Sequence, residues 1–374
     1  MELIDISVEN FRNLELEKVT FGGGTNIVTG ANGAGKTSLL EAIVVLGNLK
    51  SFRTPSLRRA VRHGEKQFHL CGTIRSATGT HRVEERFHAG PPVQRLLRVD
   101  GQEVSVARYL ANFPVFAITG PDRELVVGGP DERRALLDRL VFLLQPGYLE
   151  VFRSYRRALK QRNAALVDGR DDNEIEAWEV QLAEAAGHVV GARIKVANRL
   201  FDHFGEISEV LCGKDFPPIT IDYRTEPWWS ASEDLERVEV LYQQRYNETR
   251  TRDRQTGFTG DGPHRHDLSL RAEGRSARYE LSSGQAKTVA AALRLAALAQ
   301  IEKERREHCP VIVDDVDAEL DESSLTRLVR HLGNERQLCL SSTSDALGSH
   351  TGPEARQLRL VNGTCGNQEA DTDE

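Results

Sequence analysis

The sequence predicts an α/β protein with a mixed β-sheet core, an antiparallel β layer and an inserted α-helical arm domain. Short apolar strands fill the first 120 residues and return near residue 267. A glycine-rich loop at residues 30–37 joins a strand to a helix. From about residue 130, apolar residues recur at helical spacing. The two ends of the chain are therefore expected to form one α/β domain that the helical segment interrupts.

Composition excludes several classes of protein. The 374 residues include 49 Lys and Arg and 56 Asp and Glu, for a net charge of −7, and 39% are hydrophobic. This supports a sizeable core, and no run of about 18 apolar residues could span a membrane. The N-terminus does not resemble a signal peptide and the five cysteines form no C-x-x-C pair, so a cytoplasmic protein without zinc or disulfides is expected. The negative total does not exclude DNA, because local patches decide such binding.

The predicted elements follow in chain order. The first part contains strands at 3–8, 14–19 and 25–29, a helix at 38–47, three antiparallel strands at 67–75, 81–88 and 93–99, and a strand at 114–119. The middle part contains helices at 132–144, 149–166, 174–204 and 232–250. The last part contains strands within 267–281, a helix at 286–305, a strand at 310–313, a helix at 322–332 and a strand at 337–341. The predicted domains are a core from 1–120 and 251–366, an arm at 121–250 and an acidic tail at 367–374.

The glycine-rich loop, Gly30-Ala31-Asn32-Gly33-Ala34-Gly35-Lys36-Thr37, satisfies G-x-x-x-x-G-K-[ST] between an apolar strand and an amphipathic helix. Glycines let backbone amides turn inward around phosphate oxygens, and the helix N-terminus adds its dipole. Lys36 is expected to bridge the β and γ phosphates, and Thr37 to bind Mg²⁺ through its hydroxyl. The motif predicts a site for ATP and Mg²⁺.

Two carboxylates, Asp314 and Asp315, end the apolar strand at 310–313. In a P-loop enzyme such a strand is expected to lie beside the strand at 25–29. Asp314 would then reach Mg²⁺, and Asp315 would orient or deprotonate the attacking water. Lys36, Asp314 and Asp315 are therefore the candidate catalytic residues, and Thr37 and Asp314 the candidate metal ligands.

A second candidate anion site is Leu281-Ser282-Ser283-Gly284-Gln285, at the start of a long Ala/Leu helix. The alternative interpretation is an ordinary helix N-cap. The segment resembles the L-S-G-G-Q signature of the ABC ATPases, and Ala318-Glu319-Leu320-Asp321 resembles their D-loop. That resemblance implies that Ser283, Gly284 and Gln285 complete the ATP site of a second copy in trans. It also places Asp321 and the hydroxyl of Thr343 near the nucleotide.

Further motifs, spread in order over nearly the whole chain, resemble the RecF family. They are Asn10-Phe11-Arg12-Asn13, ANGAGKTSLLEAI, Ser51-Phe52-Arg53, Arg133-Arg134 with Leu137-Asp138, 160–166, Gly262-Pro263-His264-Arg265 with Asp267-Leu268, and LSSGQ through DDVDAELD. The resemblance implies an ABC-type head and a slow, DNA-stimulated ATPase, not a nuclease. Such a protein dimerises on ATP, binds gapped or junction DNA, and acts with RecR and RecO to load RecA in gap repair and SOS induction. It implies a nucleoid-associated protein of the cytoplasm.

Three departures from these patterns affect what the resemblance can carry. The position where transporter-type ABC ATPases keep a switch histidine falls in Ser341-Ser342-Thr343-Ser344, so only a hydroxyl is available to sense the γ-phosphate, and RecF proteins generally have hydroxyl residues here. Asp315 stands where a glutamate is usual, and its shorter reach is compatible with slow turnover. The segment Gly120-Pro121-Asp122-Arg123-Glu124 departs from the family pattern, so it carries no predicted role.

Basic residues predict a DNA surface. Arg153, Arg156, Arg157, Lys160 and Arg162 fall in one predicted helix with no acid between them, which would suit contacts to backbone phosphates, although a solvated helix face is the alternative. Arg53, Arg58 and Arg59 form a second cluster. Arg12 is a candidate nucleotide contact. His264 and Arg265 are a weaker candidate for the nucleotide or dimer surface, since a lone histidine is more often structural.

Two other functions remain open at this point. A P-loop kinase for small molecules would turn over ATP without DNA, but LSSGQ disfavours it. A nuclease with an ABC head would need an acidic Toprim domain, for which the chain has no room.

Overall fold

The chain forms two compact units in the computed structural model, which describes residues 1–213, 216–229, 237–316, 322–333, 335–342 and 355–366. The head unit comprises Met1–Val126, Glu206–Phe216 and Leu281–Glu374, and the arm unit comprises Val127–Gly205 and Pro217–Glu280. The predicted arm ended at residue 250, so that bound is corrected to Glu280. The reason is strand pairing, since residues 267–276 pair with each other and with a strand at 219–224 of the same unit.

The first sheet of the head unit is antiparallel throughout, with the strand order β2-β1-β4-β5-β6-β7. Its strands are β1 (Glu2–Phe11), β2 (Leu14–Thr20), β4 (Gln67–Ser76), β5 (Gly79–His88), β6 (Gln94–Val99) and β7 (Gln102–Glu103). Buried and more exposed positions alternate along β2 and β5, as expected for a sheet with one face on the core. The predicted antiparallel layer is confirmed, and the two N-terminal strands join it.

The second sheet of the head unit has the order β15-β14-β3-β13-β12-β8, parallel except for β15. Its strands are β3 (Thr25–Thr29), β8 (Phe116–Ile118), β12 (Val311–Val313), β13 (Leu338–Ser341), β14 (Arg356–Val361) and β15 (Thr364–Gly366). Parallel strands share one carboxyl edge, which is where ligands of open α/β sheets bind. The ends of β3, β12 and β13 therefore meet at this edge.

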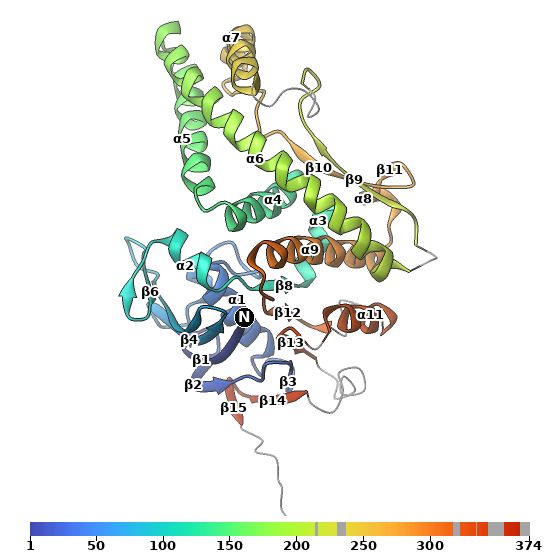
Figure 1. The fold of residues 1–374 in the computed structure, drawn as a ribbon. Helices are drawn as coiled ribbons and strands as arrows, with labels where there is room; N and C mark the ends of the chain where they lie inside the picture. Colours follow the sequence, from blue (N-terminus) through green and yellow to red (C-terminus); the bar gives the residue numbers. More distant parts are fainter. Residues whose placement is uncertain (214–215, 230–236, 317–321, 334, 343–354, 367–374) are drawn as a thin grey trace, which may run out of the picture. The chain divides into compact units, whose positions relative to one another are not determined.

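Helices fill the space between and beside the two sheets (Figure 1). Helix α1 (Lys36–Asn48) contacts β1 and β4 of the first sheet and β13 of the second, and all of its residues except Thr37 are buried. Helix α9 (Ser283–Arg305) packs on β8 and on the short helix η2 (Gly120–Arg123). The remaining head helices are η1 (Leu57–Ala60), α2 (Val106–Asn112) and α11 (Glu322–Leu332).

The arm unit is mainly helical, as predicted. Its helices are α4 (Pro130–Leu144), α5 (Tyr148–Val167), α6 (Asp172–Cys212), which continues into the head unit, α7 (Val238–Thr256) and α8 (Ala277–Glu280), while α3 (Glu124–Val127) lies at the boundary. A small antiparallel sheet of β9 (Ile219–Arg224), β10 (Asp267–Ala272) and β11 (Arg275–Ser276) completes it. Strand β9 was not among the predicted elements, because Pro217 and Pro218 indicated only an interruption of the helices, although a strand begins directly after them.

Two further features concern membrane-spanning helices and cysteines. Among the helices that the structure describes, none combines the length and apolar character needed to cross a membrane. The five cysteines are free thiols.

Candidate functional site

The glycine-rich loop follows β3 and leads into α1 at Lys36. Gly30, Gly33 and Gly35 have φ angles of 144°, 82° and 111°, which side chains disfavour. A Cβ atom on Gly30 would overlap the Leu360 carbonyl, and one on Gly35 would lie 2.8 Å from Leu14 Cδ2. Gly30 and Gly35 therefore need glycine for both conformation and space, and Gly33 for conformation alone.

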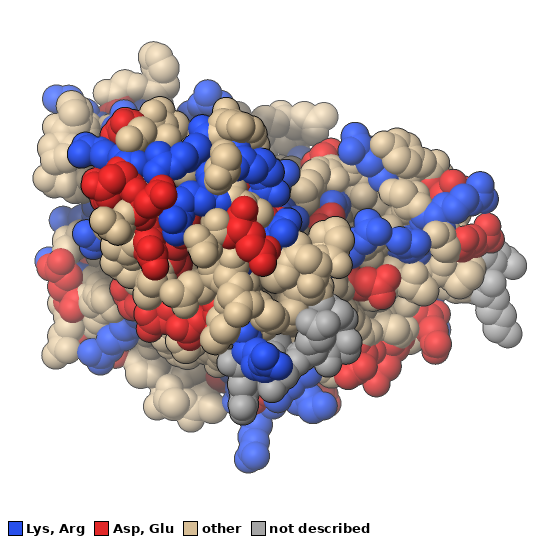
Figure 2. Space-filling model, turned by 90° about the horizontal axis from the view of Figure 1, so that it is seen from above, with Lys and Arg blue, Asp and Glu red and all other residues tan. Residues whose placement is uncertain are grey.

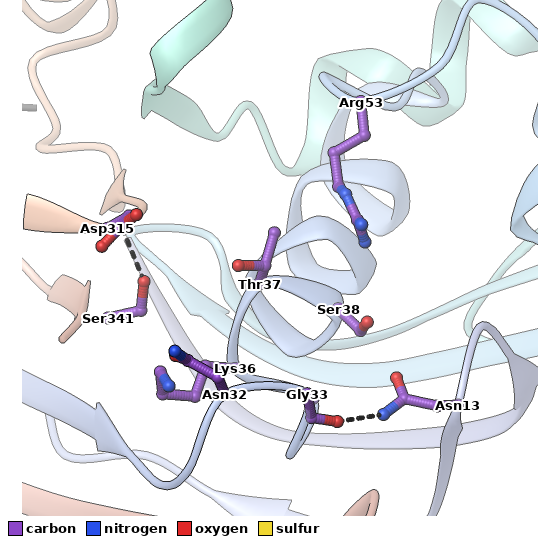
Figure 3. A pocket seen from close by; sticks show the side chains of 10 residues that line it. Asn13, Asn32, Gly33, Lys36, Thr37, Ser38, Arg53, Asp315 and Ser341 are labelled. Atoms are coloured by element: carbon purple, nitrogen blue, oxygen red, sulfur yellow. Dashed lines mark hydrogen bonds between the residues drawn. The ribbon is translucent and has the colours of Figure 1, made fainter. Parts of the chain in front are cut away.

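A pocket of about 340 Å³ opens at this loop (Figure 3). Its lining residues are Asn13, Asn32, Gly33, Gly35, Lys36, Thr37, Ser38, Arg53, Asp315 and Ser341. The structure thus brings five of the eight predicted loop residues together with the predicted carboxylate Asp315, which comes from a segment far away in the sequence. Arg53, which was predicted as a DNA contact, also lines the pocket. Asn13, Ser38 and Ser341 were not predicted as site residues.

Lys36 places its ammonium group at the start of the loop. Its Nζ donates to the carbonyl oxygens of Gly30 at 2.6 Å and Ala31 at 3.2 Å, and the residue is 9% exposed. These bonds hold a positive charge beside the inward face of the loop. An anion entering the pocket would meet that charge directly.

The two candidate carboxylates have different surroundings. Asp314 is 8% exposed, and its Oδ1 accepts a hydrogen bond from Ser341 Oγ at 2.7 Å. Burial raises the pKa of the Asp314 carboxyl, against hydrogen bonds from Ser341 and Thr37 that lower it. The Asp315 backbone N–H donates to the same Ser341 Oγ at 2.7 Å (Figure 3). Asp314 therefore lies beside Thr37, whereas Asp315 borders the open pocket.

The prediction that the strand at 310–313 lies beside the strand at 25–29 was wrong. Strand β12, which carries the carboxylates, does not lie beside β3, because β13 pairs with both of them. The intervening strand ends in Ser341, whose hydroxyl bridges Asp314 and Asp315. The sequence indicated a hydroxyl within residues 341–344, but Thr343 was the one predicted to lie near the nucleotide. The bridging role of Ser341 follows from strand order.

A buried glutamate behind the loop organises two arginines. Glu41 on α1 is 0% exposed, and its carboxylate accepts hydrogen bonds from Nε and Nη2 of Arg12 at 2.9 and 2.7 Å. The same carboxylate accepts hydrogen bonds from Ser51 Oγ at 2.5 Å and Arg53 Nη1 at 3.2 Å. Arg12 additionally donates to the Arg59 carbonyl, at 2.7 Å. Arg12, a predicted nucleotide contact, is thus bound to Glu41 and is not among the pocket-lining residues.

These residues fit a nucleoside triphosphate with Mg²⁺. The loop offers turned backbone amides, Lys36 offers a cation, and Thr37 and Asp314 lie within hydrogen-bonding reach of each other. In the described part of the chain, no group of three or more His, Cys, Asp or Glu residues could hold a metal ion. Mg²⁺ would therefore need phosphate and water oxygens beside Thr37 and Asp314, which matches its habit of keeping several waters.

The segment that resembles an ABC signature forms the N-terminus of α9. Ser282 Oγ accepts from the Gln285 N–H at 3.2 Å, and Gln285 Oε1 accepts from the Ser282 N–H at 2.9 Å, which is a capping box. Ser283 and Gly284 are exposed and take no part in it. The N-cap alternative therefore holds for Ser282 and Gln285, and it leaves Ser283 and Gly284 available to an outside group. Two other predicted nucleotide contacts, Asp321 and Thr343, lie outside the described residues.

The basic residues of α5 divide into two groups. Arg153, Arg156, Arg157 and Lys160 are exposed, and Arg153 pairs with Glu150 at 2.7 Å. Figure 2 shows that lysine and arginine side chains are interspersed with aspartate and glutamate on the face seen from the top of Figure 1. A DNA surface on that face would depend on local groups of basic side chains, such as the four exposed residues of α5.

Arg162 was wrongly assigned to that stripe. It is 0% exposed, and its guanidinium donates to Glu179 at 2.9 Å, Asp253 at 2.9 Å and Thr259 at 2.7 Å, with the Tyr246 ring 5.2 Å away. A buried cation with these partners joins α5, α6 and α7 and does not reach DNA phosphates. Helical spacing places it opposite that exposed face, on the buried side with Tyr155, Ala158 and Ala165, so the absence of nearby acids in the sequence was misleading.

The other basic candidates and the histidine turn have clear positions. Arg58 and Arg59 are exposed on η1. His264 is a structural residue, since Nδ1 accepts from the Tyr155 hydroxyl at 2.6 Å and Nε2 donates to the Thr259 carbonyl at 3.1 Å. Burial lowers the pKa of His264 to about 4, so it is neutral near pH 7. Arg265 beside it is exposed.

The fold and the site define a P-loop protein with an SMC-type head, and comparison with known proteins agrees. A family model described as the RecF/RecN/SMC N-terminal domain matches residues 2–350. The chain is similar to the DNA replication and repair protein RecF of Mannheimia succiniciproducens, at 32% identity over 97% of this chain and 98% of that protein. It is also similar to RecF of Haemophilus influenzae, at 33% identity over 89% of both chains. The chain belongs to the RecF family, as its motifs predicted.

Solved structures give the same fold. The recombination mediator protein RecF of the RecFOR pathway, solved as RecF-ATPrS, matches with a TM-score of 0.87 and 26% identity over 97% of each chain. An Smc head bound to the C-winged helix domain of ScpA matches with a TM-score of 0.55 and 14% identity, which shows a shared fold alone. The predicted fold class, an ABC-type head with an inserted helical arm, is confirmed.

Proposed function

We propose that the protein binds and slowly hydrolyses ATP with Mg²⁺ as a switch in DNA replication and repair. The observation that carries this proposal is the pocket in which the glycine-rich loop, Lys36 and Thr37 face Asp315 and Ser341 from other strands. The RecF relatives support it, because one of the similar structures was solved as RecF-ATP. Lys36 would neutralise the β and γ phosphates, Thr37 and Asp314 would hold Mg²⁺, and Asp315 would orient water.

In this proposal two copies enclose the nucleotides between them. The exposed Ser283 and Gly284 at the start of α9 would donate to the γ-phosphate bound by the other copy, with Gln285, Asp321 and Thr343 nearby. The support is positional, since these α9 residues are exposed and are not among those lining the chain's own pocket. ATP would then favour the dimer through interactions that the separate copies lack.

DNA would be held through its phosphates without base readout. The exposed residues Arg153, Arg156, Arg157 and Lys160 of α5 are one candidate surface, and Arg53, Arg58 and Arg59 of the head unit are the other. In this proposal the protein acts at gapped or junction DNA in the cytoplasm, with RecR, RecO and RecA. Membership of the RecF family supports it. No observation favours the alternative of a small-molecule kinase.

The test is light scattering of the protein with no nucleotide, ADP, ATP, and ATP plus gapped DNA. We expect ATP to convert a monomer to a dimer, the D315N variant to trap that dimer because water is no longer activated, and K36R to abolish it. ATP that binds without changing the mass in any condition would contradict the trans site.

A second variant isolates the α9 contribution. S283R places a bulky cation at the exposed helix start and is expected to bind ATP yet remain monomeric. S154R makes the same change at an exposed serine on α5 and is expected to dimerise as the unmodified protein does. An S283R variant that dimerises normally would exclude Ser283 from the dimer surface.

A further inference from the structure

The outer side of the phosphate loop is held by two turns from other parts of the head unit. The first turn joins β1 to β2 and carries Asn13, whose Nδ2 donates to the Gly33 carbonyl at 3.1 Å. The second turn joins β14 to β15 and carries Gly363, whose N–H donates to the Ala34 carbonyl at 2.9 Å. Both bonds go to consecutive loop carbonyls.

Those two carbonyls fix the direction of the next two amides. A trans peptide unit is planar, so its C=O and N–H point in opposite directions. Anchoring the Gly33 carbonyl orients the Ala34 N–H, which closes the loop on the Ala31 carbonyl at 3.0 Å. Anchoring the Ala34 carbonyl orients the N–H of Gly35, which lines the pocket. The outer bonds thus set the inner, phosphate-facing geometry.

The β14–β15 turn has little freedom to move. Its central residues Asn362 and Gly363 have φ angles of 49° and 83°, as in a tight hairpin. A Cβ atom on Gly363 would overlap the Asn13 carbonyl, so the two turns also touch each other. Strand β14 pairs in parallel with β3, up to Arg359 opposite Thr29, directly before the loop begins.

We propose that Gly363 and Asn13 are positioning residues that hold the phosphate loop in its nucleotide-binding shape. Gly363 acts through the Ala34 carbonyl, and Asn13, whose side chain also borders the pocket, acts through the Gly33 carbonyl. The inference rests on the proposed ATP site. Because a preformed loop serves the ground state and the transition state alike, its loosening should weaken ATP binding and leave the rate at saturation unchanged.

The experiment compares two variants with two matched controls. G363A adds a methyl group where Asn13 leaves no room, whereas G274A adds it to a hairpin turn with a similar φ of 79° and nothing within 4 Å. N13A removes an amide that donates to a loop carbonyl, whereas N112A removes one that donates to the Arg108 carbonyl on α2. The measurements are the Kd for a fluorescent ATP analogue with Mg²⁺, the ATPase KM and kcat, and thermal melting without nucleotide.

We expect Kd and KM to rise about tenfold in G363A and about threefold in N13A, with kcat within about twofold of the unmodified protein. G274A and N112A should keep the Kd of the unmodified protein. Nucleotide affinities of G363A and N13A equal to those of their controls would overturn the inference, as would a fall in kcat at unchanged Kd. If the unmodified protein does not bind the analogue, the proposed ATP site itself fails. N13A keeps the test valid if G363A does not fold.

Discussion

At the residue scale, three residues of the RecF-like motifs, Arg133, Asp138 and Asp267, form ion pairs within the arm unit. Arg133 binds Asp267 through two bonds of 2.8 and 2.9 Å, and Arg193 binds Asp138 through bonds of 2.7 and 2.9 Å. Buried pairs of this kind contribute little net stability, but removing one partner leaves an uncompensated charge. A motif read from sequence therefore marks a constrained position without saying whether the constraint is structural or functional.

Arg162 provides a direct test of that distinction. In R162M, Glu179 would keep Arg250 and Asp253 would keep Arg252, but both would lose their most buried partner, so the free energy of unfolding is expected to fall by about 3 kcal/mol. R157A, on the exposed face of the same helix, should change it by less than about 0.5 kcal/mol. Urea denaturation followed by circular dichroism checks both values. Equal stability of R162M and R157A would contradict the buried network.

His264 predicts a pH dependence. Its pKa is about 4 in the folded protein against 6.5 in the unfolded chain, so protonation is favoured only on unfolding. Its contribution is therefore complete above pH 6.5 and declines as the pH falls toward 4, by about 3 kcal/mol in all. H264Q keeps a donor for the Thr259 carbonyl but does not titrate. The difference in stability between the unmodified protein and H264Q, measured from pH 7.5 to 4, should shrink by about that amount; a constant difference would contradict it.

At the element scale, the phosphate loop was predictable and its surroundings were not. Glycine positions, Lys36 and the following helix are local requirements, so one stretch of sequence reveals them. The placement of β13 between β3 and β12 is a pairing of segments far apart in the chain, and the roles of Ser341 and Gly363 depend on it. Asn13 lay within a recognised motif, but only the packing of its turn shows which loop carbonyl it contacts.

The start of α9 separates a structural serine from an exposed one. S282A removes the capping box, so we expect the free energy of unfolding to fall by about 1 kcal/mol, with ATP-driven dimerisation retained once the protein is folded. S283A should leave stability unchanged and weaken the ATP-dependent dimer. Thermal denaturation and light scattering of the two variants check this. If S282A weakened the dimer and S283A lowered the stability, the trans contact would belong to Ser282 and not to Ser283.

At the scale of the whole molecule, a chain with a net charge of −7 needs local basic surfaces to bind DNA. Removing one basic side chain that pairs with a DNA phosphate should reduce the slope of log K against log salt concentration by about 0.9. If α5 holds DNA, replacing Arg153, Arg156, Arg157 and Lys160 with alanine should flatten the slope by several times that amount. R58A/R59A tests the head surface in the same way. Fluorescence anisotropy with duplex DNA at several salt concentrations measures both, and an unchanged slope excludes the corresponding surface.

Short stretches of sequence were enough to predict the α/β class, the phosphate loop, the carboxylate pair, the inserted helices and membership of the RecF family. These features depend on local propensity, periodicity and short motifs, which neighbouring residues carry together. The folded chain was needed to show that Arg162 is buried, that Ser341 bonds both carboxylate residues and that Gly363 bonds the loop. Burial and strand order arise from contacts between segments that are far apart in the chain. No short stretch of sequence contains both partners of such a contact, so local patterns cannot predict it.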